Sequence, residues 1–169
     1  MQILKFGGTS VENATNITKV SEIIITSSAK DKTAVVVSAL GGITDSLLKC
    51  ATLASVADEA YKTIIDEIEQ RHTNAVKEMI PVSGQSFLTD FVKNSIKEIA
   101  GICNGIYLLG ELSERTKDRV ISFGEILSSR ILSAKLHSMS LENEWKDSRE
   151  IIKTDSNFGK AAVNLFITN

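Results

Sequence analysis

The order of apolar patterns at the amino-terminal end of the sequence constrains the fold more than any other feature. Residues 2–6 form a short apolar segment, and residues 33–38 form a continuous, mostly β-branched run. Between them, residues 13–27 carry apolar side chains at the three- and four-residue spacing of an amphipathic helix. A continuous apolar strand is typical of a parallel sheet that is buried on both faces. The sequence therefore predicts a right-handed β–α–β unit and an α/β fold.

A glycine pair follows the first predicted strand. Residues 5–10 read Lys-Phe-Gly-Gly-Thr-Ser, which lacks the spacing of a Walker A loop. Glycine lets the backbone approach a ligand closely, and the start of a following helix attracts anions. A lysine adds about 4 kcal/mol against a unit charge about 4 Å away at an effective dielectric near 20. The spacing alone fits a phosphate loop and an ordinary strand–turn–helix corner equally well. The candidate residues are Lys5, Gly7, Gly8, Thr9 and Ser10.

A second glycine pair, Gly41-Gly42, follows the second predicted strand. Ligands of open α/β sheets bind beyond the carboxyl ends of parallel strands, where both glycine pairs are expected to lie. Ser38 and Thr44 flank this pair, so both are candidates for contact with a small anionic ligand. The structural alternative, favoured by spacing alone, is that Thr44 caps a helix starting near Thr44 or Asp45.

Residues 58–79, 86–109 and 116–136 show helical periodicity, and residues 141–147 resemble a strand. Because this helical stretch is long for a simple crossover, we interpret it as an inserted helical subdomain.

Glu125 is a candidate site residue in a third region of the sequence, after the two glycine pairs. Ser122 and Glu125 have the spacing of a capping box, which is the favoured structural interpretation. Gly124 costs a helix about 1 kcal/mol relative to alanine, which a cap does not require. The small neighbouring residues leave room for something to approach Glu125, whose carboxylate could hold a substrate ammonium group. The charge-rich turn at 147–155 fits a solvated loop better than a site.

Composition excludes several classes of function. The 169 residues carry a net charge of -2, and only 5% are aromatic. Neither property favours a nucleic-acid partner. Cys50 and Cys103 have no metal-binding spacing and are expected to be buried on helices, and we expect no metal site formed by side chains. His72 and His137 lie in helical stretches without partners at catalytic spacing. With no signal peptide or membrane-spanning pattern, the sequence predicts a cytoplasmic protein.

Several motifs together resemble the amino-terminal half of the catalytic domain of aspartate kinases, within the amino-acid kinase superfamily. They are Lys5-Phe6-Gly7-Gly8-Thr9-Ser10-Val11, Val36-Val37-Ser38-Ala39, Gly42-Ile43-Thr44, Gly110-Glu111-Leu112-Ser113, Arg115-Thr116, Asp118, Ser122-Phe123-Gly124-Glu125, Ser128, Asp147, Thr154-Asp155 and Phe158. The stretch from Glu111 to Thr116 is more similar to the monofunctional, lysine-sensitive branch than to fusions with homoserine dehydrogenase.

The resemblance implies a three-layer αβα fold with a mainly parallel central sheet, of which residues 1–169 form the amino-terminal half. It also implies transfer of the ATP γ-phosphoryl group, with Mg²⁺, to the β-carboxylate of L-aspartate. The product, 4-phospho-L-aspartate, opens the biosynthesis of lysine, threonine and methionine. Lys5, Gly7 and Gly8 would stabilise the transferring group, and Thr9 and Ser10 would complete the phosphate side. The aspartate-binding residues would be Ser38, Thr44 and Glu125.

In the family, an adenine-binding half and regulatory ACT domains follow, and neither is present in this sequence. The resemblance therefore implies an inactive fragment of an enzyme that is a homodimer at full length. Two alternatives remain open. One is a related kinase acting on glutamate, acetylglutamate or carbamate, and the other is a non-catalytic interaction module that uses the helices at 45–112.

Overall fold

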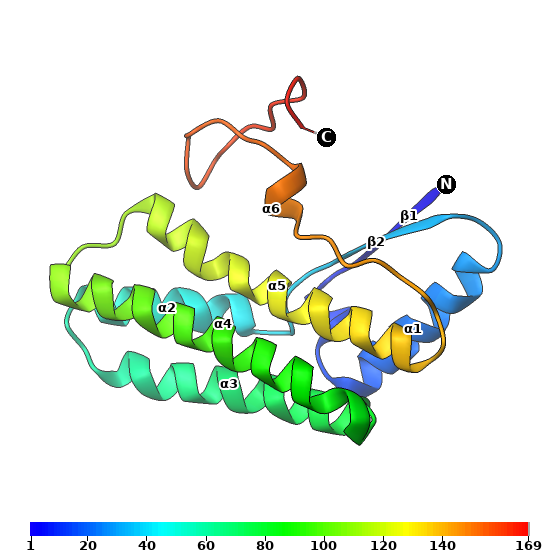
Figure 1. The fold of residues 1–169 in the computed structure, drawn as a ribbon. Coiled ribbons are helices and arrows are strands. Elements are labelled where there is room, and N and C mark those ends of the chain that lie inside the picture. The colour runs from blue at the N-terminus through cyan, green and yellow to red at the C-terminus, as the bar shows by residue number, and fades with distance from the viewer. Residues whose placement is uncertain (169) are drawn as a thin grey trace.

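The computed structural model describes residues 1–168 (Figure 1). Asn169, the last residue of the predicted 1–169 domain, lies outside the described residues. The elements, in chain order, are β1 (Gln2–Phe6), a 3-10 helix η1 (Gly8–Val11), α1 (Ala14–Ser28), β2 (Thr33–Val37), α2 (Ile43–Ser55), α3 (Ala60–Met79), α4 (Val82–Leu109), α5 (Glu114–Ser138) and α6 (Ser148–Ile151).

Strands β1 and β2 pair in parallel, with Lys5 opposite Val36 and Phe6 opposite Val37. Helix α1 connects them, which confirms the predicted β–α–β unit and the α/β class with a parallel sheet. Side chains alternate across the two strands because successive residues point to opposite faces. One face packs against the hydrophobic core. On the other, Ile3 is 66% exposed and Val36 is 52% exposed. The prediction that the second strand is buried on both faces is therefore wrong for residues 33–37.

Helices α2–α5 lie side by side beyond the sheet (Figure 1). Their inward stripes supply fully buried side chains, among them Leu47, Ile68, Ile99 and Leu127. Helix α5 also contacts α1 and β2, so it joins the helical layer to the sheet. The inserted helical region predicted from periodicity is present, and both cysteines are buried on its helices as expected.

Several predicted boundaries differ from the structure. Helix α4 begins directly after Pro81 and runs through Gly84, so it starts before residue 86, where the periodicity predicts its start. Proline is tolerated at a helix start because its missing N–H has no partner there. Residues 116–136 belong to one continuous helix, α5, which is capped by Ser113.

The strand predicted at 141–147 is wrong: residues 141–147 have no regular secondary structure. Side-chain hydrogen bonds hold this segment against α5 instead. Asn143 Oδ1 accepts a hydrogen bond from Ser133 (2.7 Å), and the indole N–H of Trp145 donates to Ser129 (2.9 Å).

The carboxy-terminal segment after α6 folds back on itself above α5 (Figure 1). Thr154 and Val163 form an antiparallel bridge. The Gly159 N–H donates to Asp118 (2.7 Å), and the Arg115 guanidinium lies 5.7 Å from the Phe158 ring centroid. These contacts tie the segment to the first turns of α5. No helix within residues 1–168 is both long enough and apolar enough to cross a bilayer.

Candidate functional site

The two glycine loops meet at the carboxyl ends of the paired strands. The Ser38 N–H donates to the Phe6 carbonyl (3.0 Å), which extends the pairing of the strands by one bond. A Cβ atom on Gly8 would lie 3.5 Å from the Ala39 carbonyl oxygen and 3.9 Å from the Ser38 hydroxyl. The structure therefore brings the loop at 7–10 into contact with the loop at 38–42, as the sequence predicted.

Lys5 lies on the exposed face of the sheet, next to Val36. Its ammonium group points toward the glycine loop: the Lys5 Nζ lies 3.8 Å from the position that a Gly7 Cβ would occupy. The next loop residues, Thr9 and Ser10, belong to η1, where the Ser10 N–H donates to the Gly7 carbonyl (2.9 Å). The amide of Ser10 is therefore already engaged, while the lysine lies beside the loop it was predicted to serve.

Glu125 reaches the second loop from α5. Its Oε1 accepts a long hydrogen bond from the Ala39 N–H (3.4 Å), and Ser128 donates to the Ser38 carbonyl (2.7 Å). Both contacts join residues more than 80 positions apart, since the separations are 86 and 90. They hold the backbone of the loop against the middle of α5.

The capping-box interpretation of Ser122 and Glu125 is wrong. Both residues lie in the interior of α5, whose cap is Ser113, and the Ser122 hydroxyl donates to the Arg119 carbonyl. The glycine at position 124 is explained by a close contact instead. A Cβ atom there would lie 2.7 Å from the Ala39 Cβ, so glycine is what allows helix and loop to approach so closely.

Thr44 is not the helix cap that its spacing suggested. Helix α2 starts one residue earlier, at Ile43, after Gly42, which has a φ of 77°. That left-handed conformation is costly for residues with a Cβ and explains the second glycine of the pair. Thr44 therefore stands in the first turn of α2, half-buried, close after the loop that contacts Gly8.

Glu125 also lines an open cavity of about 290 Å³. Val35, Val36 and Val37 line the same cavity, which therefore lies along β2. Asp147 and Arg149 are among the other residues that line it. They form a tight pair in which Arg149 Nη2 lies 2.6 Å from Asp147 Oδ2. The hydrogen bonds between the two side chains lower the pKa of Asp147 and raise the pKa of Arg149.

Sequence reasoning missed this pair, because it treated residues 147–155 as a solvated loop. The Asp147 side chain is only 12% exposed and caps α6 by accepting from the Arg149 N–H (3.0 Å). The signal in the sequence was the Asp-Ser-Arg spacing, which permits a fork-shaped pair between neighbours, but spacing does not say what such a pair faces.

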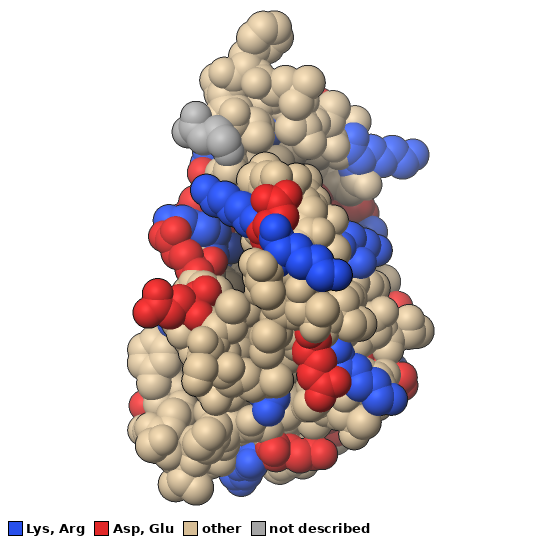
Figure 2. Space-filling view, turned by 90° about the vertical axis from the view of Figure 1, so that its right-hand side faces the viewer, with Lys and Arg blue, Asp and Glu red and all other residues tan. Residues whose placement is uncertain are grey.

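Within residues 1–168, no three His, Cys, Asp or Glu side chains gather closely enough to hold a metal ion. A nucleotide-bound Mg²⁺ does not require such a cage, because it keeps several waters and binds mainly through phosphates. On the face shown in Figure 2, basic and acidic side chains are interspersed.

The amino acid kinase family model matches residues 1–166. The aspartokinase of Chlamydia muridarum (strain MoPn / Nigg) is 33% identical over 165 residues, which cover 96% of this chain and 33% of that protein. The chloroplastic bifunctional aspartokinase/homoserine dehydrogenase 2 of Arabidopsis thaliana is 28% identical over 169 residues, covering 95% of this chain and 18% of that protein.

Among solved structures, E. coli aspartokinase III in complex with aspartate and ADP has a TM-score of 0.85 at 22% identity. The match covers 99% of this chain and 35% of that one. The chain thus spans about a third or less of the length of these relatives. The family model covers both glycine loops and Glu125, and the fold matches a solved aspartokinase: this chain belongs to the amino acid kinase family and resembles its aspartokinases.

Proposed function

We propose that residues 1–169 form the amino-terminal part of the catalytic domain of an aspartate kinase. The observation that carries this proposal is the corner where the Gly7-Gly8 loop, the Ser38–Gly42 loop and Glu125 meet. The E. coli relative, which has the same fold, was solved with aspartate and ADP. The reaction would transfer the ATP γ-phosphoryl group to the β-carboxylate of L-aspartate, giving 4-phospho-L-aspartate for lysine, threonine and methionine biosynthesis.

This chemistry suits the residues present. A β-carboxylate oxygen attacks the γ-phosphorus, the bond from that phosphorus to the bridging oxygen breaks, and ADP leaves. Because the nucleophile is already ionised, no strong general base is needed, and catalysis depends on positioning and charge neutralisation. Lys5 would hold negative charge on the transferring group, together with the amides of Gly7 and Gly8. Thr9 and Ser10 would complete the phosphate side, and Mg²⁺ would supply further neutralisation.

Glu125 would bind the ammonium group of aspartate. Among the described residues, its Oε1 accepts one long bond, from the Ala39 N–H, so the carboxylate is oriented but retains accepting capacity. Ser38 and Thr44 would line the same site, with the Ser38 backbone fixed by Ser128. This role distinguishes amino-acid substrates with a free ammonium group from acetylglutamate and carbamate, which have none.

Kinetics of the complete enzyme test these roles. Glu125→Gln should raise the KM for aspartate strongly, while the KM for ATP stays near normal. Lys5→Ala should lower kcat far more than it raises the aspartate KM, because its interaction is strongest in the transition state. Exposed Lys19 and Glu142 provide matched controls, Lys19→Ala and Glu142→Gln, which should change neither constant. Unchanged kinetics in both site variants, or turnover on glutamate in preference to aspartate, would contradict the assignment.

Residues 1–169 alone should show no measurable aspartate-dependent ADP formation and only poor ATP binding. We infer that the adenine-binding half and the regulatory ACT domains belong to a longer protein, which we propose to be a cytoplasmic homodimer. A coupled assay that finds normal turnover with these residues alone would overturn this part of the proposal.

A further inference from the structure

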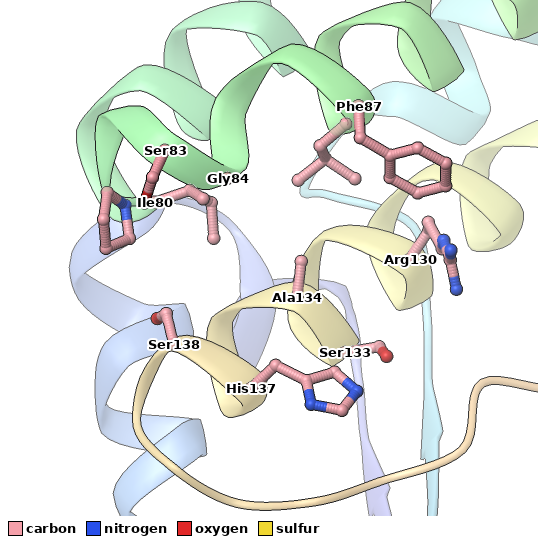
Figure 3. A pocket seen from close by; sticks show the side chains of 11 residues that line it. Ile80, Ser83, Gly84, Phe87, Arg130, Ser133, Ala134, His137 and Ser138 are labelled. Atoms are coloured by element: carbon pink, nitrogen blue, oxygen red, sulfur yellow. The ribbon is translucent and has the colours of Figure 1, made fainter.

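A second cavity, of about 390 Å³, lies between the start of α4 and the end of α5 (Figure 3). It shares no lining residue with the cavity beside Glu125. Ile80, Pro81, Phe87 and Leu88 give it apolar walls on the α4 side. Its volume falls within the range of small-molecule sites, which are largely apolar with a few polar groups that orient the ligand.

The orienting group in this cavity is Arg130. Its guanidinium carbon lies 5.3 Å from the ring centroid of Phe87, 5.8 Å from that of Phe91 and 5.2 Å from that of Trp145. Rings at this distance attract a cation and restrict its side chain. They come from two positions on α4 and one on the segment after α5, so the tertiary fold assembles them around the charge.

Arg130 differs from two of the protein's other arginines, which are paired with carboxylates. Arg119 pairs with Glu98 (2.7 Å) and Arg149 pairs with Asp147 (2.6 Å). Arg130 has no carboxylate within ion-pair distance among residues 1–168. A planar fork of N–H donors that is fixed by aromatic rings and lacks an internal anion is arranged for bidentate binding of an external one.

The other polar groups of the cavity define what that anion carries. No Asp or Glu lines it among the described residues, so a ligand ammonium group would find no carboxylate there. The hydroxyls of Ser133 and Ser138 already donate to Asn143 and to the Lys135 carbonyl. His137, which also lines the cavity, adds no negative charge.

We propose that the groove between α4 and α5 binds a small monocarboxylic acid with an apolar or aromatic body. The carboxylate pairs with Arg130, and the body packs against Ile80, Pro81 and Phe87. This site is separate from the proposed aspartate site, which needs an ammonium-binding carboxylate that this groove lacks. A free phosphate shares the anionic chemistry but leaves the apolar walls uncovered, so it should bind far more weakly.

The chain's one tryptophan provides the assay, since Trp145 lies against the same guanidinium. Titration of the chain with 3-phenylpropanoate should change its fluorescence saturably, with a dissociation constant of about 0.1–1 mM for a ligand of this size. Calorimetry should give the same value. The neutral 3-phenylpropan-1-ol, phenylalanine and inorganic phosphate should each bind at least about tenfold more weakly.

Variants locate the site. Arg130→Gln should weaken 3-phenylpropanoate binding at least about tenfold, and Ala134→Leu, which fills the cavity without changing a charge, should do the same. Arg119→Gln is the matched control and should bind like the original chain. Far-ultraviolet circular dichroism of each variant verifies folding. The proposal is overturned if 3-phenylpropanoate shows no saturable binding, if the alcohol binds equally well, or if both cavity variants bind normally. Self-association of the chain that buries this groove and excludes the ligand would also overturn it.

Discussion

Replacing Gly124 by alanine tests the contact that holds the candidate site together. In an exposed helix interior, this change stabilises by about 0.5–1 kcal/mol, because glycine loses more backbone freedom on folding. At position 124 the new methyl group would lie 2.7 Å from the Ala39 Cβ and 3.5 Å from the Leu47 Cδ1. Carbon atoms pack best at about 3.5–4.0 Å, so the loop would have to move by roughly 1 Å.

That movement strains two hydrogen bonds as well as the packing. The bonds from the Ala39 N–H to Glu125 and from Ser128 to the Ser38 carbonyl both cross the same contact. Overpacking costs about 1–3 kcal/mol, and a weakened hydrogen bond about 1 kcal/mol. After the helix gain is subtracted, we expect Gly124→Ala to lower the free energy of unfolding by about 2 kcal/mol. The melting temperature would then fall by about 4–8 °C.

Helix α4 contains the matched control. Gly101 and Gly105 lie in its interior, and a Cβ atom at either position would meet no atom of residues 1–168 within 4 Å. Gly101→Ala should therefore raise the free energy of unfolding by about 0.5–1 kcal/mol. Urea unfolding followed by circular dichroism measures both variants.

The double variant Gly124→Ala/Ala39→Gly removes the colliding methyl group. It should recover most of the loss, with a coupling energy of about 1–3 kcal/mol. If Gly124→Ala stabilises the chain as Gly101→Ala does, or if Ala39→Gly gives no recovery, the close approach of α5 to the loop is refuted.

Three further measurements probe the core and the loop anchor. Burial lowers the pKa of His72 to about 4, and its Nε2 has no partner in the described structure. The neutral imidazole therefore does not reduce the free energy of unfolding above the unfolded pKa near 6.5. That free energy should fall by about 3 kcal/mol as the pH drops from 6.5 to 4, because the unfolded chain binds the proton more readily. Urea titrations of His72→Gln at pH 7.5 and 4.5 should show a smaller loss between these pH values than the original chain, and equal losses would contradict the assignment. Ser128→Ala should cost about 1 kcal/mol and raise the aspartate KM of the complete enzyme with little change in the ATP KM, because it frees the Ser38 carbonyl; an unchanged KM would mean that the loop needs no such anchor. Burial raises the pKa of Cys50 to about 12 and that of Cys103 to about 11, so both thiols should resist a disulfide reagent at pH 8 until urea unfolds the chain, and rapid labelling of the native chain would contradict their burial.

Much of the fold follows from local pattern. The two strands, α1 and the apolar stripes of α3 and α4 were predicted because hydrophobic periodicity reports directly which residues face a core. The glycine loop at 7–10 and the loop at 38–42 were placed at the same sheet edge because parallel strands end together. Boundary predictions were wrong where local signals were ambiguous, as at Thr44: this good cap residue lies two positions after Gly42, the glycine that the turn requires and after which the helix begins.

The sequence by itself determined the β–α–β unit, the two loops and the residue types that suit phosphate and ammonium groups, since these depend on neighbours along the chain. Only the tertiary structure decided that Glu125 accepts a hydrogen bond from the Ala39 N–H and that Gly124 lets α5 approach Ala39 closely. It also decided that Arg130 lies among three aromatic rings. Local spacing favoured a capping box for Glu125 because spacing carries no information about Ala39, which lies 86 residues away in the sequence. Such contacts are set by how whole helices pack on a sheet, which depends on the summed burial of many side chains.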